Sequence, residues 1–353
     1  NIYINSGLLI KSTDASQVIG VLAHEIGHIE SGHLSRLTGA QNRAGKEMLI
    51  GSILGGAAAM LGKPAVGAAI AAGGTHVGTR NFLKFSRTQE SAADQAALRY
   101  LEATGQSARG LVNFLKLLID QDLLSASDQD PYARTHPFSR QRIDVINNHI
   151  KKSRFSNVPT SEDFKLRHRR MKAKLHAFLR STAKTLRQYP ESDSSQHARY
   201  ARAIAYYKRP QLKRALPIID GLIENYPDDP FFHEFKGQML FENGRAEQAL
   251  AHYERATSLL PTSALLRGEL ARVQLELGGP RLIMQSTVNF RAALDIEPGN
   301  AFYWRQLGIA YGKLNLIGKS ALALSEEAIL RKKFANAISL AERAKKKFPI
   351  GSP

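Results

Sequence analysis

The amino-acid sequence predicts a mainly α-helical protein with two domains. Its 353 residues exceed the roughly 100–200 residues of one ordinary domain. The segment around His24–His28 follows the apolar period of a helix. In the second half, four prolines recur in similar contexts at spacings of 37, 34 and 37 residues: Pro190, Pro227, Pro261 and Pro298. A histidine motif in the first half and regularly spaced helix ends in the second predict two parts with different tasks.

The composition excludes several classes of protein. Apolar residues make up 43% and charged residues 23%, which is close to globular averages and excludes a wholly disordered chain. The absence of cysteine excludes disulfides, thiolate zinc sites and cysteine nucleophiles. Lys and Arg outnumber Asp and Glu by 49 to 31, so the chain is attracted to anionic surfaces. We expect no nucleic-acid partner, because no basic segment is interleaved with aromatic residues.

The first nine residues, Asn1 to Leu9, alternate like a β-strand. Such a strand either lies at an edge, where it can pair with an extended peptide, or is an internal structural strand. Because the chain starts with Asn in the middle of this pattern, and no leader precedes it, we expect an N-terminally truncated domain.

The motif His24-Glu25-Ile26-Gly27-His28 is the candidate metal site. Asp14 to Gln17 resembles a capping box, and an apolar stripe follows at Val18, Leu22, Ile26 and Ile29, so this segment is expected to be helical. His24 and His28 then project from one face as two ligands of a zinc ion, and Glu25 is placed to act as general base. The metal lowers the pKa of a bound water to roughly 7, and the carboxylate takes its proton.

A third ligand can be sought by elimination. A metzincin requires HExxHxxGxxH, but Ser31 occupies the glycine position and Leu34 the last histidine position, with His33 one residue early. The better candidate is Glu90, in a second helical pattern that runs from Arg87 towards Gly105. Asp94 lies one turn further on the same face and would hold a ligand imidazole through its other N–H group. The alternative for Glu90 and Asp94 is a solvated acidic pair.

The segment from Thr135 to Arg140 supplies two more candidates. His136 would approach the metal or the oxyanion, and Arg140 would pair with a carboxylate near the site. On spacing alone, His136 is a loop histidine before a proline. The histidines of the chain beyond these have no ligand spacing, and we assign them no role.

Between the two metal motifs lie two arms rich in Gly, Ala and apolar residues, Met48 to Met60 and Ala65 to Gly74, joined by Lys63-Pro64. Neither arm reaches the ~20 apolar residues that a membrane-spanning helix needs. We expect a mobile helical hairpin that lies over the active-site cleft or touches a membrane surface, with an integral membrane segment as the lesser alternative.

Ser, Asn, Pro and Thr cluster at Ser153–Ser161 and mark a domain boundary. We expect a metallopeptidase domain at 1–155, a basic linker and helix at 156–190, and a repeat domain at 191–353. The run from Lys165 to Arg187 holds nine Lys or Arg and is either a solvated helix face or a binding patch.

The second half matches the tetratricopeptide repeat, which has a period of about 34 residues and the pattern W-x2-L-G-x2-Y, A-x3-F, P. Small residues let neighbouring helices approach, and large ones fill the gaps. The segments 318–331 and 334–347 predict helices of an atypical terminal cap. The repeats either form a groove for a peptide or partner, or brace the first domain. The matching positions are Trp304, Leu307, Gly308 and Tyr311 for the first half, and Ala249, Tyr253, Ala256 and Pro261 for the second, with Gly237 at the small position.

The motifs HEIGH, RTQESAAD and THPFSR, followed by these repeats, resemble the zinc metalloproteases of peptidase family forty-eight, which include HtpX and the CAAX prenyl endopeptidases. With the added repeats, the nearest resemblance is to the BepA-type bacterial periplasmic proteases. It implies a gluzincin-like zinc protease domain with a small β-sheet, followed by a tetratricopeptide-repeat α-superhelix. By motif position, the metal ligands would be His24, His28 and Glu90. Glu25 would be the base, Asp94 the second acidic residue, and His136 and Arg140 further site residues.

The resemblance also implies a function. It points to a zinc endopeptidase, with one Zn²⁺ per chain, that cleaves misfolded or stalled outer-membrane proteins in the periplasm. The repeats would bind substrates or the outer-membrane assembly machinery, and a peripheral membrane contact and a chaperone role are further expectations. The alternative is a latent or inactive protease that acts mainly as a chaperone or scaffold. The intact Glu25 argues against a dead enzyme, but His136 in the fourth zinc position would displace the water and make the site latent.

Overall fold

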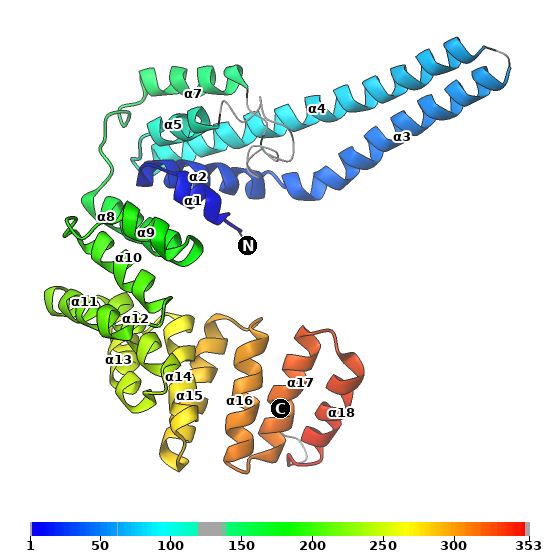
Figure 1. Ribbon diagram of the computed structural model, residues 1–353. Helices are drawn as coiled ribbons and strands as arrows, with labels where there is room; N and C mark the ends of the chain where they lie inside the picture. The colour runs from blue at the N-terminus through cyan, green and yellow to red at the C-terminus, as the bar shows by residue number, and fades with distance from the viewer. Residues whose placement is uncertain (1, 62, 119–135, 137–138, 350–353) are drawn as a thin grey trace. The chain divides into compact units, whose positions relative to one another are not determined.

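The structure is a computed structural model that describes residues 2–61, 63–118, 136 and 139–349 (Figure 1). It divides into two compact units, Asn1–Leu175 and His176–Pro353. The division falls inside the segment 156–190 that the sequence assigns to a basic linker and helix. The prediction of a mainly helical chain is confirmed. The small β-sheet is not found, because the described residues contain no strand.

The first unit contains the helices α1 (Ser6–Lys11), α2 (Ala15–Glu30), α3 (His33–Met60), α4 (Pro64–Ala103), α5 (Arg109–Leu117) and α7 (Arg140–Lys152), with α8 (Glu162–Leu179) running on into the second unit. The strand predicted for the first nine residues is wrong in the part that is described. The Asn5 side chain accepts a hydrogen bond from the backbone N–H of Gly7 and starts α1 there.

Helix α2 starts where the sequence predicts it, since the Asp14 side chain accepts a hydrogen bond from the backbone N–H of Ser16. Two glycines let α2 approach its neighbours closely. A Cβ at Gly20 would lie 2.7 Å from the backbone of Leu111 on α5, and one at Gly27 would lie 2.8 Å from the carbonyl oxygen of Ala93 on α4. The histidines of α2 therefore face the part of α4 that carries Glu90.

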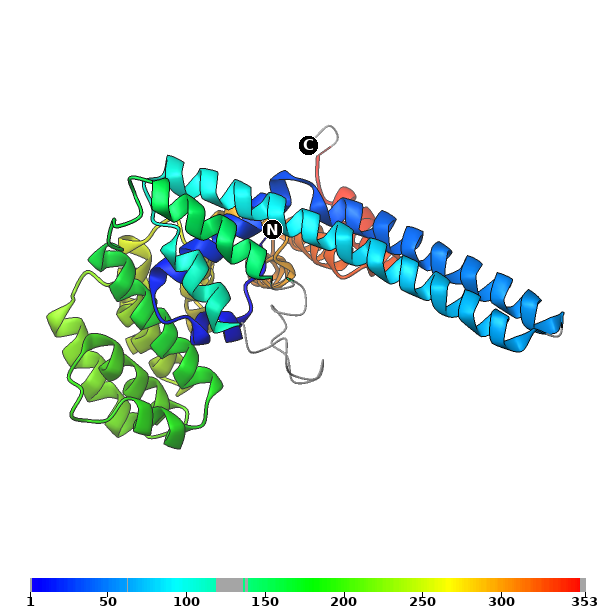
Figure 2. The ribbon, with the colours of Figure 1, turned by 90° about the horizontal axis from the view of Figure 1, so that it is seen from above.

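Helices α3 and α4 form an antiparallel hairpin, as the sequence predicts, and run side by side over their outer parts (Figure 2). The apolar arms extend away from α2 and α5 (Figure 1), and Glu90 lies further along α4 than the arm 65–74, so these arms do not lie over the candidate site. Among the described residues, no helix combines the length and apolar character needed to cross a membrane.

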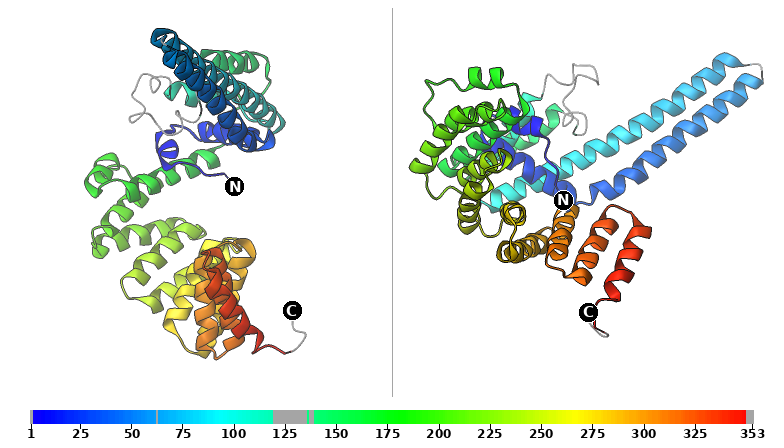
Figure 3. Two further views of the ribbon diagram at one scale, coloured as in Figure 1. Left: turned by 90° about the vertical axis from the view of Figure 1, so that its right-hand side faces the viewer. Right: turned by 60° about the horizontal axis from the view of Figure 1, so that its bottom comes forward.

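The second unit is a succession of antiparallel helix pairs (Figure 3). Each of the four regularly spaced prolines stands two residues after the end of a helix, which explains their common context. The helices are α9 (Thr182–Gln188), α10 (Gln196–Tyr207), α11 (Leu212–Asn225), α12 (Pro230–Glu242), α13 (Ala246–Leu259), α14 (Ala264–Leu277), α15 (Pro280–Ile296), α16 (Ala301–Lys313), α17 (Ile317–Leu330) and α18 (Phe334–Lys345).

Glycines in this unit make room for large side chains of helices packed against them, as the repeat pattern predicts. A Cβ at Gly237 would lie 2.9 Å from the ring of Tyr253, and one at Gly268 would lie 2.4 Å from the ring of Tyr303. Both tyrosines are buried. Helix α17 pairs with α16 as a further repeat, which leaves α18 as the terminal helix.

Candidate metal centre

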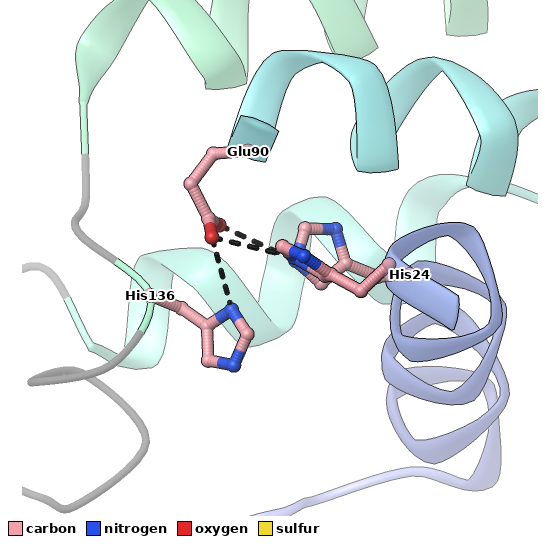
Figure 4. A group of neighbouring side chains, drawn as sticks. His24, Glu90 and His136 are labelled. Carbon is pink, nitrogen blue, oxygen red and sulfur yellow. Dashed lines mark hydrogen bonds and ion pairs between the residues drawn. The ribbon is translucent and has the colours of Figure 1, made fainter. Parts of the chain in front are cut away.

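Four side chains converge at one point in the first unit: His24 and His28 from α2, Glu90 from α4, and His136. Figure 4 shows how His24, Glu90 and His136 of this group point toward one another. Each offers one ligand atom, and these atoms all lie within 4.8 Å of one another. The Nε2 atoms of His24 and His28 are 3.0 Å apart, and each lies 3.3 Å from a carboxylate oxygen of Glu90. Two imidazoles and a carboxylate that meet in this way suit a zinc ion, which takes N and O ligands at about 2 Å.

Glu25 borders this group on the same helix. Its Oε1 atom lies 3.4 Å from His136 Nε2, and the side chain is 23% exposed, whereas that of Glu90 is 4% exposed. The side chain is thus close to the metal ligands and partly exposed, while its Oε1 atom is buried and has no hydrogen-bond partner among the described residues. This position suits a group that exchanges protons with water rather than a ligand.

Asp94 holds the imidazole of His24 from behind. An oxygen of Asp94 lies 2.9 Å from His24 Nδ1, which leaves Nε2 free to bind a metal. Arg142 makes a bidentate pair with Asp94, with N···O distances of 2.6 and 2.8 Å, and its Nη1 atom lies 2.8 Å from Glu90 Oε2. All four of these side chains are buried. One guanidinium therefore fixes both carboxylates of α4.

The buried charges shift the pKa values at this centre. Burial alone would lower the pKa of His24, but the carboxylates of Asp94 and Glu90 outweigh it and raise the value to about 9. Burial tends to raise the pKa of Glu90, yet the histidines and Arg142 hold it well below its usual range. The pKa of Asp94 is lowered as well, chiefly because Arg142 opposes the effect of burial. The surroundings favour positive charge at this point, which fits a bound cation.

The arginine at the centre is Arg142, whereas the sequence suggested Arg140. Arg140 is exposed at the first residue of α7, which begins where Ser139 caps the backbone N–H of Arg142. The signal for Arg142 was present, because it shares a buried face of α7 with Ile146 and Ile150 at intervals of four residues. Of the remaining THPFSR residues, Thr135, Pro137 and Phe138 lie outside the described part of the chain.

His33 is a further residue of the centre that sequence reasoning missed. Its Nδ1 atom lies 2.8 Å from Nδ1 of His28, and it is buried. If Nε2 of His28 is to bind a metal, its Nδ1 must carry the proton and donate a hydrogen bond to Nδ1 of His33. The sequence assigns His33 no role, because it stands one residue early for the metzincin motif. In the structure, Gly32 adopts a left-handed conformation at φ 61° between α2 and α3, which turns His33 back towards His28.

Comparisons with known proteins give two family matches. Residues 1–150 match peptidase family M48, and residues 200–264 match the tetratricopeptide repeat. The chain is 26% identical over 360 residues to the beta-barrel assembly-enhancing protease of Escherichia coli (strain K12), which covers 100% of this chain and 72% of that protein. The protease of the same name from Yersinia pestis is 22% identical over 355 residues, with the same coverage. The crystal structure of YrrB, a TPR protein with an unusual peptide-binding site, is 17% identical and covers 50% of this chain and 91% of YrrB, at a TM-score of 0.41.

Proposed function

From the peptidase family M48 domain at residues 1–150 and the tetratricopeptide repeats that follow it, we propose that this chain is a zinc-dependent endopeptidase that hydrolyses misfolded or stalled outer-membrane proteins. The observation that carries the proposal is the convergence of His24, His28 and Glu90, with Glu25 beside them. The metal would be held by these three ligands, one ion per chain.

When bound, zinc supplies a Lewis acid that polarises a peptide carbonyl and makes a water acidic enough to react near neutral pH. The chain itself supplies the base. Glu25 accepts the proton of the attacking water at a carboxylate oxygen and delivers it to the amine that leaves. Asp94 and Arg142 keep His24 and Glu90 in the orientation that ligation requires.

The substrate class rests on the relatives. Those that span the whole chain are named beta-barrel assembly-enhancing proteases, which supports a periplasmic protein that acts during outer-membrane protein assembly. The repeats would recognise substrates or the assembly machinery, since stacked helical repeats offer extended surfaces for protein ligands.

The test is digestion of casein, an unfolded protein, by the purified chain. Glu25→Gln keeps the shape of the side chain but removes the base, so cleavage should fall by at least about a hundredfold while zinc stays bound. Treatment with a chelator should stop cleavage, and added zinc should restore it. Full activity of Glu25→Gln would exclude the assigned base, and activity that survives complete metal removal would exclude a metalloenzyme.

A second candidate is a latent peptidase that acts mainly through its repeats, and the position of His136 favours it. Its Nδ1 atom lies 3.2 Å from Glu90 Oε1, inside the group of ligand atoms, and its Nε2 atom lies beside Glu25. A fourth ligand at that point would exclude the reacting water. His136→Ala should then increase casein cleavage, whereas equal or lower cleavage would count against latency.

A further inference from the structure

The outer part of the α3–α4 hairpin, residues 48–78, exposes large apolar side chains, and we refer to it as the hairpin tip. The exposed fraction is 59% for Leu49, 60% for Ile53, 86% for Met60 and 81% for Leu61. On α4, Val66, Ile70 and Val77 are exposed as well. Isolated apolar residues are common on protein surfaces, but a continuous group of this size marks an interaction surface.

The two helices of the tip meet through glycines instead of large side chains. A Cβ at Gly51 would lie 2.5 Å from the Cα of Gly74, and one at Gly55 would lie 2.5 Å from the carbonyl oxygen of Gly67. The backbones therefore pack directly against each other, as small residues allow for helices in lipid. With the interface filled by backbone, the large apolar side chains have no neighbour of their own hairpin to cover them.

Basic residues stand behind the tip on the same hairpin. Residues 33–88 contain seven Lys or Arg and one acidic residue, Glu47, which accepts hydrogen bonds from the side chain of Asn81. All seven are exposed: Arg36, Arg43, Lys46, Lys63, Arg80, Lys84 and Arg87. All but one of them lie nearer the base of the hairpin than the apolar group does.

The apolar and basic residues share faces of their helices. On α4, Val66, Ile70 and Val77 are followed by Arg80 and Lys84, at intervals of three, four and seven residues that keep one face of a helix. On α3, Lys46 precedes Leu49, Ile50 and Ile53 at the same intervals. Each helix thus carries one stripe that is apolar near the tip and basic near the base.

We propose that the hairpin tip inserts into the surface of an anionic phospholipid bilayer, with the basic residues behind it contacting lipid phosphates. An apolar tip with a basic belt matches the apolar interior and the anionic surface of such a bilayer. The apolar part of α3, residues 48–60, is about 20 Å long, which is shorter than the ~30 Å hydrocarbon core. Lys63 at the turn must also keep its ammonium group near water. The tip therefore enters one leaflet obliquely and does not span the membrane.

This inference does not depend on the proposed catalytic activity. Membrane insertion of the tip would nevertheless affect the position of the metal centre, because α4 is one continuous helix from Pro64 at the tip to Glu90 and Asp94. A hairpin held in lipid would therefore keep the first unit, with its candidate metal centre, close to the membrane surface.

The absence of cysteine in the chain allows a direct test. Leu61→Cys carries an environment-sensitive fluorophore at the tip, and Ile338→Cys, 62% exposed on α18, carries the same fluorophore as the matched control. The full-length protein is mixed with vesicles of phosphatidylcholine alone or with added phosphatidylglycerol. We expect a blue shift for Leu61→Cys with phosphatidylglycerol vesicles and no shift for Ile338→Cys.

Charge reversal separates the basic belt from the apolar tip. The triple variant Arg43→Glu, Arg80→Glu, Lys84→Glu should weaken vesicle binding by at least about tenfold. High salt should weaken vesicle binding of the protein that keeps these three basic residues. No blue shift at Leu61→Cys with anionic vesicles would overturn the proposal, as would equal shifts at both positions. A shift at Leu61→Cys that rises with protein concentration in the absence of lipid would also overturn it, because a second copy of the chain would then cover the tip.

Discussion

Each unit has an apolar core, but the first unit also buries a cluster of paired charged side chains at one point. In the second unit, His176–Pro353, which we call the repeat unit, rings such as those of Tyr253 and Tyr303 fill the space that glycines leave on a helix packed against them. In the first unit, which we call the peptidase unit, Gly20 and Gly27 let helices meet backbone to backbone. Beside this contact, Glu90, Asp94 and Arg142 are buried as paired charged groups. Burial of rings stabilises a fold, whereas burial of charges costs free energy unless every charge is paired. The peptidase unit thus adds to its apolar core a set of buried charges that costs free energy unless paired, and such a set marks a site.

The pKa values of two histidines, one in each unit, differ in the same way. The pKa of His24 is raised to about 9 because carboxylates outweigh its burial. The pKa of His252 in the repeat unit is lowered to about 4, by burial and by the nearby charges of Lys236 and His233. The buried imidazole of His24 is therefore held ready for positive charge, whereas the half-buried imidazole of His252 is kept neutral.

The largest effect is expected from removing the positive charge of Arg142, which pairs with both buried carboxylates of the metal centre. Arg142→Gln leaves two buried carboxylates without their guanidinium, so the metal-free chain should lose about 3–5 kcal/mol of unfolding free energy. Zinc affinity should fall by about 10–100-fold, because His24 and Glu90 lose their support. Both are measured by urea unfolding and zinc competition titration.

The exposed Arg140 two residues earlier provides the control. Arg140→Gln should change neither unfolding nor zinc affinity. A similar loss in both variants would show that helix α7 as a whole, and not the Arg142 pairing, supports the centre.

A smaller effect is expected from crowding the packing of the repeat unit. Gly268→Ala places a Cβ 2.4 Å from the ring of Tyr303, which must shift, so the repeat unit should lose about 1–3 kcal/mol. Zinc binding should be unaffected. Unfolding of this unit can be followed by the fluorescence of Trp304, the single tryptophan of the chain.

Gly299→Ala is the matched control, since a Cβ at Gly299 has no heavy atom within 4 Å. Equal stability of Gly268→Ala and Gly299→Ala would contradict the tight fit between α14 and α16.

The smallest effect concerns pH. Because the folded pKa of His252 lies near 4 and its ordinary value is 6.5, the unfolded chain binds a proton between these values that the folded chain does not. Stability of the repeat unit should therefore fall as the pH drops from about 6.5 towards 4, by roughly 1 kcal/mol, since the ring is only half-buried. The Trp304 unfolding transition at about pH 7 and about pH 5 measures it. His252→Gln should lose this pH dependence; a transition equally pH-dependent in both would assign it to other groups.

The parts of the molecule that follow from local spacing were predictable from the sequence. The repeat helices and the shared face of His24 and His28 depend on helical periodicity, which the sequence displays directly. Glu90 is predicted by elimination and by resemblance, and its approach to the histidines depends on the packing of α2 against α4 at Gly27. The rest depends on features that periodicity does not show. The Asn5 cap turned an alternating segment into a helix. The left-handed Gly32 brought His33 back to His28, and the direction of the buried face of α7 selected Arg142 over Arg140.

Zinc content is the most direct test of the central claim that the buried charged centre is a metal site. The full chain, reconstituted with zinc and dialysed, should retain one zinc per chain, with X-ray absorption showing nitrogen and oxygen ligands only. Glu25→Gln and Arg140→Gln should retain it, and Glu90→Gln and His28→Gln should lose most of it. A wild-type chain that retains no zinc, or a Glu90→Gln variant that binds it as tightly as wild type, would contradict the account.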